Sequence, residues 1–293
     1  MTVSKRCKQG QKKGNKLKPV NRKNLCALLI IDLDGTVLRT DKTISLRFKE
    51  AAREASNKGI KLVFASGRTL ENLIDFVTEL EFLPNDNYII ACNGALIWEQ
   101  KSKQILRTDM LVHKDILYIK EFASQICSPC FLINNRTLHS PFNYSASNDI
   151  RKYTTLPVTW GSFNWQDKKV VTPKMMFIAS SKEIDSIQAK IPQSLREHYN
   201  FVRSEPNYLE VMKKNVHKGA ACQFLAKYLK ISSSQIIAIG DEYNDVEMLK
   251  YAGLGIAMQN AREEIKAIAD WVTLSNDCDG VAYAIEKWIL NSE

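Results

Sequence analysis

Leu28-Leu29-Ile30-Ile31-Asp32-Leu33-Asp34-Gly35-Thr36 passes from an apolar run to two carboxylates, a glycine and a threonine. An apolar run bounded by a turn is typical of a buried strand. Asp32 and Asp34 therefore lie where the strand leaves the sheet, which in open α/β sheets is where ligands bind. Because two negative charges at this point repel each other, the pair predicts either a divalent cation or a carboxyl group that keeps its proton.

The positive charge of the chain is confined to its beginning. The net charge is +9 over 293 residues, and residues 1–23 contain nine basic residues and no acidic one. The remainder is balanced, with 32 basic and 32 acidic residues, which argues against nucleic acid as a partner of the folded part. The basic segment predicts a disordered tail. It either contacts an anionic partner such as nucleic acid or a membrane surface, carries an address signal, or has no specific role.

Composition also bears on the compartment. The chain is 45% hydrophobic, yet no apolar run approaches the roughly 18 residues that a transmembrane helix needs. The polar N-terminus shows no signal peptide. Seven cysteines, odd in number and scattered, favour a reducing compartment over a disulfide framework. These features predict a cytoplasmic protein without a transmembrane segment.

Strand and helix patterns alternate at both ends of the chain but not in the middle. Short apolar runs separated by helical patterns occupy residues 25–92, and the same alternation returns after His217. Such alternation predicts a doubly wound parallel sheet. Short strand-like pieces dominate from about Ala95 to Lys213, which predicts an inserted α+β lobe. The expected organisation is a tail over 1–23, a discontinuous core over 24–96 and 214–293, and an insert over 97–213.

Three strand ends carry polar residues that a parallel sheet would bring to one edge. They hold Asp32 with Asp34, Ser66-Gly67-Arg68, and Asp241 with Asn244 and Asp245. A single acidic residue at a strand end is usually a turn or cap residue. Three such ends in one domain favour a common site instead.

The residue types at these ends predict phosphoryl chemistry. Carboxylates without paired histidine or cysteine make an all-oxygen site, which selects Mg²⁺. Ser66, the backbone N–H groups after it, Lys218 and a helix beginning at Thr69 would neutralise an anion beside that ion. Since the chain lacks a Gly-x-x-x-x-Gly-Lys-Ser/Thr loop, the remaining route is an aspartate nucleophile that forms an aspartyl-phosphate.

The motifs resemble those of a known superfamily. Asp32-Leu33-Asp34-Gly35-Thr36 looks like the first motif of the haloacid dehalogenase (HAD) superfamily. Ser66-Gly67-Arg68, Lys218-Gly219 and Gly240-Asp241-Glu242-Tyr243-Asn244-Asp245 follow in the order of its other motifs. The insert is similar to the large α/β cap of Cof-type members. The resemblance implies a Rossmann-like core whose cap sets specificity. It also implies a phosphatase for a small phosphorylated metabolite, of the sugar phosphate, pyridoxal phosphate or FMN class.

The resemblance also implies a role for each matched residue. Asp32 would be the nucleophile and a Mg²⁺ ligand, and Asp241 would be another ligand. Asp34 would be the general acid and then the base, and it would bind Mg²⁺ through its backbone carbonyl. Asp245 would orient Lys218 or the ion. Contacts to the phosphate would come from Ser66, Lys218, Asn244 and the backbone amides of Leu33 and Gly67.

Physical chemistry supports separate tasks for the two aspartates. Their spacing would place both side chains on one face of an extended strand. A nucleophile must stay ionised, and Mg²⁺ with Lys218 would lower the pKa of Asp32. A general acid must hold a proton near neutral pH, so the Asp34 side chain is expected off the metal. Arg68 is expected to pair with an acidic residue or the substrate, and the former is favoured.

Two other functions are compatible with parts of the sequence. A sugar phosphomutase would share the nucleophile and the acid/base pair but return the phosphoryl group to a sugar. A non-catalytic binding protein would act through the basic tail, but the intact Asp32, Asp34, Lys218 and Asp241 argue against it. The motifs leave the substrate and the oligomeric state open.

Overall fold

The computed structural model describes residues 26–80, 84, 86–134, 136–140, 150–161, 164 and 166–291. The basic tail expected over residues 1–23 lies outside these ranges, so the inference about it stays a prediction. Within the ranges, no helix combines the length and the apolar character needed to cross a membrane.

The larger sheet is assembled from both ends of the chain. Its eight strands are β1 (Leu28–Asp32), β2 (Lys61–Ala65), β3 (Tyr88–Ala91), β4 (Leu96–Glu99), β5 (Gln104–Thr108), β14 (Ile236–Gly240), β15 (Leu254–Ala257) and β16 (Trp271–Val272). Their order in space is β16-β15-β14-β1-β2-β3-β4-β5. The strands from β16 to β3 pair in parallel, whereas β4 and β5 pair antiparallel to their neighbours. The predicted parallel α/β core is therefore confirmed, and β1 lies inside it between β14 and β2.

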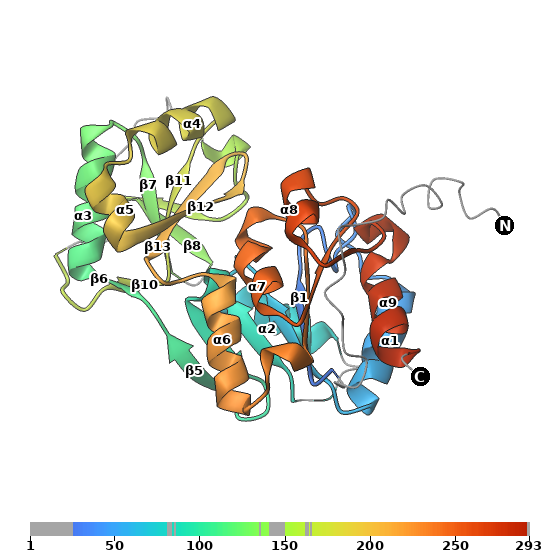
Figure 1. The fold of residues 1–293 in the computed structure, drawn as a ribbon. Coiled ribbons are helices and arrows are strands. Elements are labelled where there is room, and N and C mark those ends of the chain that lie inside the picture. Colours follow the sequence, from blue (N-terminus) through green and yellow to red (C-terminus); the bar gives the residue numbers. More distant parts are fainter. Residues whose placement is uncertain are drawn as a thin grey trace.

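Helices cover both faces of this sheet. They are α1 (Leu46–Asn57), α2 (Leu70–Glu79), α6 (Lys218–Leu229), α7 (Val246–Tyr251), α8 (Glu263–Ile268) and α9 (Gly280–Ile285). Figure 1 shows α1 and α9 on one side of β1, and α6 and α7 on the other. Because both faces are covered, all five side chains of β1 are buried, which explains the unbroken apolar run before Asp32. Ser45 is the N-cap of α1, and its hydroxyl accepts a hydrogen bond from the Phe48 backbone N–H.

A second unit lies beside the core (Figure 1), and we call it the inserted unit. Its main sheet contains β7 (Cys130–Asn134), β8 (Thr137–Ser140), β9 (Val158–Trp160), β11 (Met175–Ile178), β12 (Tyr199–Glu205) and β13 (Tyr208–Lys213). The order in space is β12-β13-β11-β7-β8-β9. Its helices are α3 (His113–Gln125), α4 (Ser181–Lys190) and α5 (Gln193–His198), and a small separate sheet pairs β6 (Leu111–Val112) with β10 (Val171–Thr172).

The two faces of the inserted sheet have different neighbours. Phe177 of β11 and Leu209 of β13 pack with apolar residues of α3, α4 and α5. Because side chains alternate along a strand, Met176 and Glu210, which are paired partners, lie on the opposite face. This opposite face is the one that takes part in the candidate site.

The sequence analysis ended the first part of the core at residue 96, but the two strands β4 and β5 that follow still belong to the core sheet. β4 begins at Leu96, and β5, which the sequence analysis assigned to the insert, extends the larger sheet by antiparallel pairing. An antiparallel hairpin has the same sequence pattern in either unit, so the pattern could not show which sheet it joins. We therefore propose that the inserted unit begins after Thr108.

Three of the described cysteines, Cys92, Cys130 and Cys222, are buried. Cys26, Cys92, Cys127, Cys130 and Cys222 are free. Burial raises the pKa of Cys92, Cys130 and Cys222 to about 12, so these side chains act as small apolar residues.

Candidate active site

The polar strand ends and the inserted unit enclose a cleft of about 1260 Å³. Seven of the residues singled out from the sequence line it: Asp32, Asp34, Ser66, Gly67, Lys218, Asp241 and Asn244. Leu33 has a fully buried side chain, so only its backbone can contribute. Asp245 is also fully buried and lies behind Lys218. The fold thus gathers residues from four separate segments of the sequence.

Lys218 is a buried cation held between two carboxylates. Its Nζ donates hydrogen bonds to Asp32 Oδ1 at 2.5 Å and to Asp245 Oδ1 at 2.6 Å. Burial alone would lower the pKa of Lys218, but the two carboxylates outweigh it and raise that pKa above its usual range. Lys218 therefore stays charged at the place where a phosphoryl group would meet Asp32.

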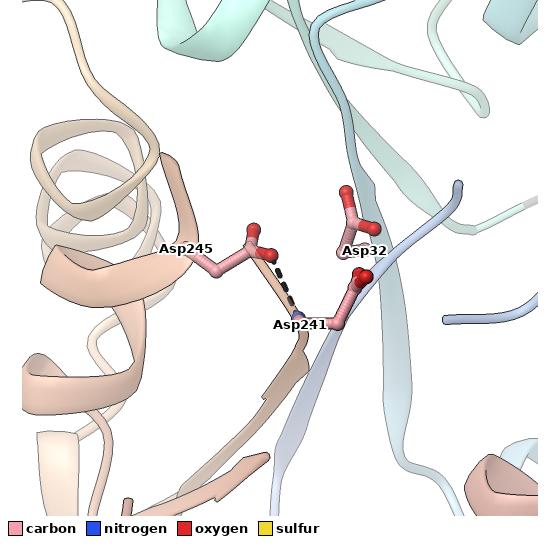
Figure 2. Close-up of side chains that lie close together, drawn as sticks. All are labelled: Asp32, Asp241 and Asp245. Atoms are coloured by element: carbon pink, nitrogen blue, oxygen red, sulfur yellow. Dashed lines mark hydrogen bonds between the residues drawn. The ribbon is translucent and has the colours of Figure 1, made fainter. Parts of the chain in front are cut away.

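Asp245 serves as the support for this arrangement. Its second oxygen, Oδ2, accepts hydrogen bonds from the backbone N–H groups of Asp241 at 3.0 Å and Glu242 at 3.1 Å. Figure 2 shows the first of these bonds. Both carboxylate oxygens of Asp245 are therefore engaged, one with Lys218 and the other with the turn after β14.

Gly35 and Thr36 fit against the carboxylate of Asp241. Thr36 Oγ1 donates a hydrogen bond to Asp241 Oδ1 at 2.8 Å. Gly35 adopts a φ of 79°, in the left-handed region, and a Cβ added there would lie 2.3 Å from Asp241 Oδ2. The glycine of the first motif is therefore required by backbone conformation and by the close approach of Asp241.

Three carboxylates concentrate negative charge at this point. Asp32, Asp241 and Asp245 each place an oxygen within 4.8 Å of the others (Figure 2). Burial raises the pKa of Asp32 well above its ordinary value, and Asp245 and Asp241 add to the rise against the opposite effect of Lys218. Burial and the charge of Asp245 raise the pKa of Asp241 to about 7. A divalent cation would relieve this repulsion and lower both pKa values.

The donor set suits Mg²⁺. Oδ2 of Asp32 and Oδ2 of Asp241 make no hydrogen bond within the described residues, whereas the oxygens of Asp245 are already used. Free carboxylate oxygens without histidine or cysteine beside them form a hard site, which Mg²⁺ prefers. Asp32 and Asp241 are therefore the side chains that fit a bound ion.

Asp34 has a different environment from Asp32. β1 ends at Asp32, so Asp34 lies in the turn beyond the strand. The sequence analysis had instead placed both side chains on one face of an extended strand. Arg68 and Lys42 both donate hydrogen bonds to its carboxylate. Burial would raise the pKa of Asp34, but these two cations outweigh it and lower that pKa. The expectation that Asp34 holds a proton near neutral pH is wrong for this arrangement, because its ion pairs favour the charged form.

The loop after β2 leads into the N-terminus of α2. Ser66 is buried, and its Oγ accepts a hydrogen bond from the Arg68 backbone N–H at 3.2 Å. Thr69 precedes α2 but makes no capping hydrogen bond with its side chain. Its hydroxyl is buried at the cleft without a hydrogen-bond partner among the described residues. Together with the positive end of the helix, this hydroxyl could hydrogen-bond to an anion.

Three further residues of the cleft escaped the sequence analysis. Lys174 and Glu210 form a buried ion pair at 2.6 Å, and Asn93 donates a hydrogen bond to Glu210 Oε2 at 2.8 Å. Lys174 and Glu210 lie 36 residues apart in a region without motifs, so no local signal marked them. Asn93 directly follows residues 25–92, where the sequence analysis placed alternating strands and helices, and this position is its only sequence signal.

Comparison with known proteins supports these observations. A family model described as haloacid dehalogenase-like hydrolase matches residues 29–285. The 5-amino-6-(5-phospho-D-ribitylamino)uracil phosphatase YcsE of Bacillus subtilis is 30% identical over 266 residues, which cover 90% of this chain and 96% of that protein. Phosphatase YwpJ of the same organism is 29% identical over 290 residues, with 88% and 98% covered. The crystal structure of a haloacid dehalogenase-like hydrolase from Bacteroides thetaiotaomicron superposes with a TM-score of 0.77 at 28% identity, covering 89% of this chain and 99% of that one.

Proposed function

The chain belongs to the family of haloacid dehalogenase-like hydrolases, and from this premise we propose that it is a Mg²⁺-dependent phosphatase working through an aspartyl-phosphate on Asp32. The family assignment confirms the resemblance found in the motifs, and the named relatives support phosphatase activity. The observation that carries the mechanism is the buried contact of Lys218 with Asp32, beside the raised pKa of Asp241.

Asp32 and Asp241, with the backbone carbonyl of Asp34, would hold Mg²⁺, which would draw negative charge away from the phosphoryl oxygens. Lys218 adds a second positive charge on the same side of Asp32. The hydroxyl of Ser66, the amide of Asn244 and the backbone N–H groups of Leu33 and Gly67 would hold the remaining phosphoryl oxygens. With Mg²⁺ bound, this arrangement would keep Asp32 ionised, although burial and the neighbouring Asp245 and Asp241 raise its pKa.

In the first step, a carboxylate oxygen of Asp32 forms a bond to phosphorus while the bond between phosphorus and the leaving alcohol oxygen breaks. The alcohol oxygen takes a proton, which we assign to Asp34. In the second step, water attacks the phosphorus of the aspartyl-phosphate and gives its proton to Asp34. Inorganic phosphate leaves, and the carboxylate of Asp32 is restored.

The ion pair between Arg68 and Asp34 suits the second step but not the first. An ionised Asp34 is ready to accept the proton of the attacking water in the second step. The first step needs a protonated Asp34, so the contact with Arg68 must open before the leaving group departs. We therefore propose that Arg68 controls when Asp34 acts as an acid.

The substrate is proposed to be a small phosphorylated metabolite of the sugar phosphate, pyridoxal phosphate or FMN class. The inserted unit supplies one wall of the cleft and would act as the cap that selects the leaving group. A relative named for a phosphorylated ribitylamino-uracil supports a small polar substrate. A cytoplasmic location and an anionic partner for the basic tail stay predictions.

A screen of phosphorylated metabolites tests the proposal. The purified chain is incubated with each compound and Mg²⁺, without a bisphosphate activator, and released inorganic phosphate is measured. We expect release that stops when a chelator is added and returns with excess Mg²⁺. Release that a chelator leaves unchanged would contradict the proposed metal dependence, and a product that depends on a bisphosphate would indicate a phosphomutase.

A further inference from the structure

A buried ion pair of the inserted unit reaches into the core at the cleft. Lys174 lies just before β11 and Glu210 lies in β13, and their side chains are only 5% and 3% exposed. Lys174 Nζ donates hydrogen bonds to Glu210 Oε1 at 2.6 Å and to the backbone carbonyl of Gly67 at 2.8 Å. A lysine of the inserted unit thus binds the backbone of the loop that carries Ser66.

Glu210 connects the ion pair to Asn93, which follows β3 of the core. Its Oε2 accepts the hydrogen bond from Asn93, and Asn93 Oδ1 accepts one from Asn244 Nδ2 at 2.9 Å. Asn93 also donates its backbone N–H to the carbonyl of Ser66 at 2.9 Å. Two routes of hydrogen bonds therefore link the segments expected to hold the phosphoryl group. One runs directly through Asn93, and the other passes through Lys174 and Glu210 of the inserted unit.

Stability alone is a weak reason to keep such a pair. Removing two charges from water costs about as much as their attraction returns, and apolar replacements are often equally stable. Met176, the paired partner of Glu210 in β11, already belongs to an apolar cluster on this face, so apolar packing is available nearby. Ser204 of β12 also donates a hydrogen bond to Glu210 Oε1 at 3.0 Å. What distinguishes the ion pair is that each member also hydrogen-bonds to the core, Lys174 to Gly67 and Glu210 to Asn93.

We propose that Lys174 and Glu210 are positioning residues for phosphate binding. They hold the Ser66-Gly67 loop and, through Asn93, the amide of Asn244 in the arrangement that binds a phosphoryl group. Tight binding of the phosphoryl group then requires the inserted unit to be seated on the core. This inference rests on the proposed function, since it assumes that these segments bind phosphate.

The test measures the affinity for inorganic phosphate by calorimetry, on the full chain with saturating Mg²⁺. The variants are Lys174→Met, Glu210→Gln and the double variant. We expect each to weaken phosphate binding about tenfold, a coupling typical between linked sites. The double variant is expected to be no weaker than the single ones, because breaking one link already interrupts the route through the inserted unit.

The double variant separates positioning from stability. A single variant leaves one buried charge unpaired and can unfold the chain, whereas the double variant removes both charges and keeps the fold. If the pair serves stability alone, the folded double variant binds phosphate as the wild type does, within twofold, and this result would overturn the inference. Melting curves of every variant show which samples are folded.

Tyr199→Phe is the matched control. It removes the hydrogen bond from Tyr199 to Asp115 at 3.0 Å inside the inserted unit, and neither residue lines the cleft. We expect its phosphate affinity to stay within twofold of the wild type, and a loss as large as that of Lys174→Met would contradict a specific role for the pair. A wild-type chain that binds no phosphate would overturn the proposed function itself. Because that result comes from the wild-type protein and not from the variants, the two failures can be told apart.

Discussion

Arg68 binds Asp34 through two parallel hydrogen bonds, from Nε to Oδ2 at 2.8 Å and from Nη2 to Oδ1 at 2.7 Å. This paired geometry gives a strong and directional contact between a guanidinium and a carboxylate. It joins the loop after β2 to the turn after β1, and it lowers the pKa of the residue assigned to proton transfer. Arg68 is therefore part of the catalytic machinery in this proposal.

Replacing Arg68 should change the pH dependence of the reaction. In Arg68→Met, burial of Asp34 persists while its main cation is gone, so the pKa of Asp34 rises. An acid is active when protonated, so the fall in kcat/KM at alkaline pH should move to higher pH. Lys42→Met removes the more exposed cation and should shift the fall less, in the same direction. An unchanged alkaline limb in Arg68→Met would disprove the link between Arg68 and the acid.

Removing the nucleophile should abolish turnover. Asp32→Asn keeps the shape of the side chain but cannot form the aspartyl-phosphate, so phosphate release should fall to background. Asp34→Asn should slow release by roughly 10²- to 10⁴-fold, which is the usual contribution of general acid–base catalysis. Initial rates and melting temperatures of both purified variants check this. Full activity of folded Asp32→Asn would remove Asp32 from the mechanism.

The stability of the metal-free chain should decrease as pH rises. Folding raises the pKa of Asp241 from 3.8 to about 7, so the folded state binds the proton more tightly than the unfolded state. The stability from this group is full below pH 3.8 and is lost as pH rises through about 7. In a chelator, the melting temperature should therefore drop across this range. Mg²⁺ should cancel the drop, and Asp241→Asn should reduce it. A melting temperature in chelator that rises over this range would refute the assignment.

The hydroxyl of Thr36 should strengthen the binding of Mg²⁺ through Asp241. Thr36→Val keeps the size of the side chain but removes its hydrogen bond to Asp241. Loss of such an outer partner typically weakens metal affinity about tenfold. The concentration of Mg²⁺ for half-maximal activity should rise accordingly, while Thr36→Ser should stay close to the wild type. Equal Mg²⁺ dependence of the two variants would show that the hydroxyl does not matter.

Gly219 should be sensitive to any added side chain. A Cβ there would lie 2.6 Å from Glu247 Cβ and 2.8 Å from the Glu247 backbone oxygen, so the first turn of α6, which carries Lys218, would have to move. We expect Gly219→Ala to cost about 1–3 kcal/mol of stability and to lower kcat. Gly59→Ala is the control, because it meets no atom within 4 Å and strains only a backbone φ of 84°. It should lose stability but keep kcat, and an equal loss of kcat in both would point to general destabilisation.

Features that depend on neighbouring residues in the chain were predictable. The apolar run before Asp32 and the turn at Gly35 follow from residue types over a few positions, and the structure places them as expected. The parallel core was predictable for a related reason. Alternating strand and helix patterns allow few arrangements, and these bring the ends of parallel strands to one edge.

The sequence by itself thus determined the parallel core and the position of the motif residues at the ends of its strands. Only the tertiary structure decided which partners those residues meet. Arg68 reaches Asp34 across 34 positions, and Lys174 reaches Gly67 across 107. The charge state of Asp34 and the polar link between the two units depend on burial and on such distant contacts. A local pattern cannot encode either, because the pKa of a group and the partner of a buried charge are set by everything packed around them.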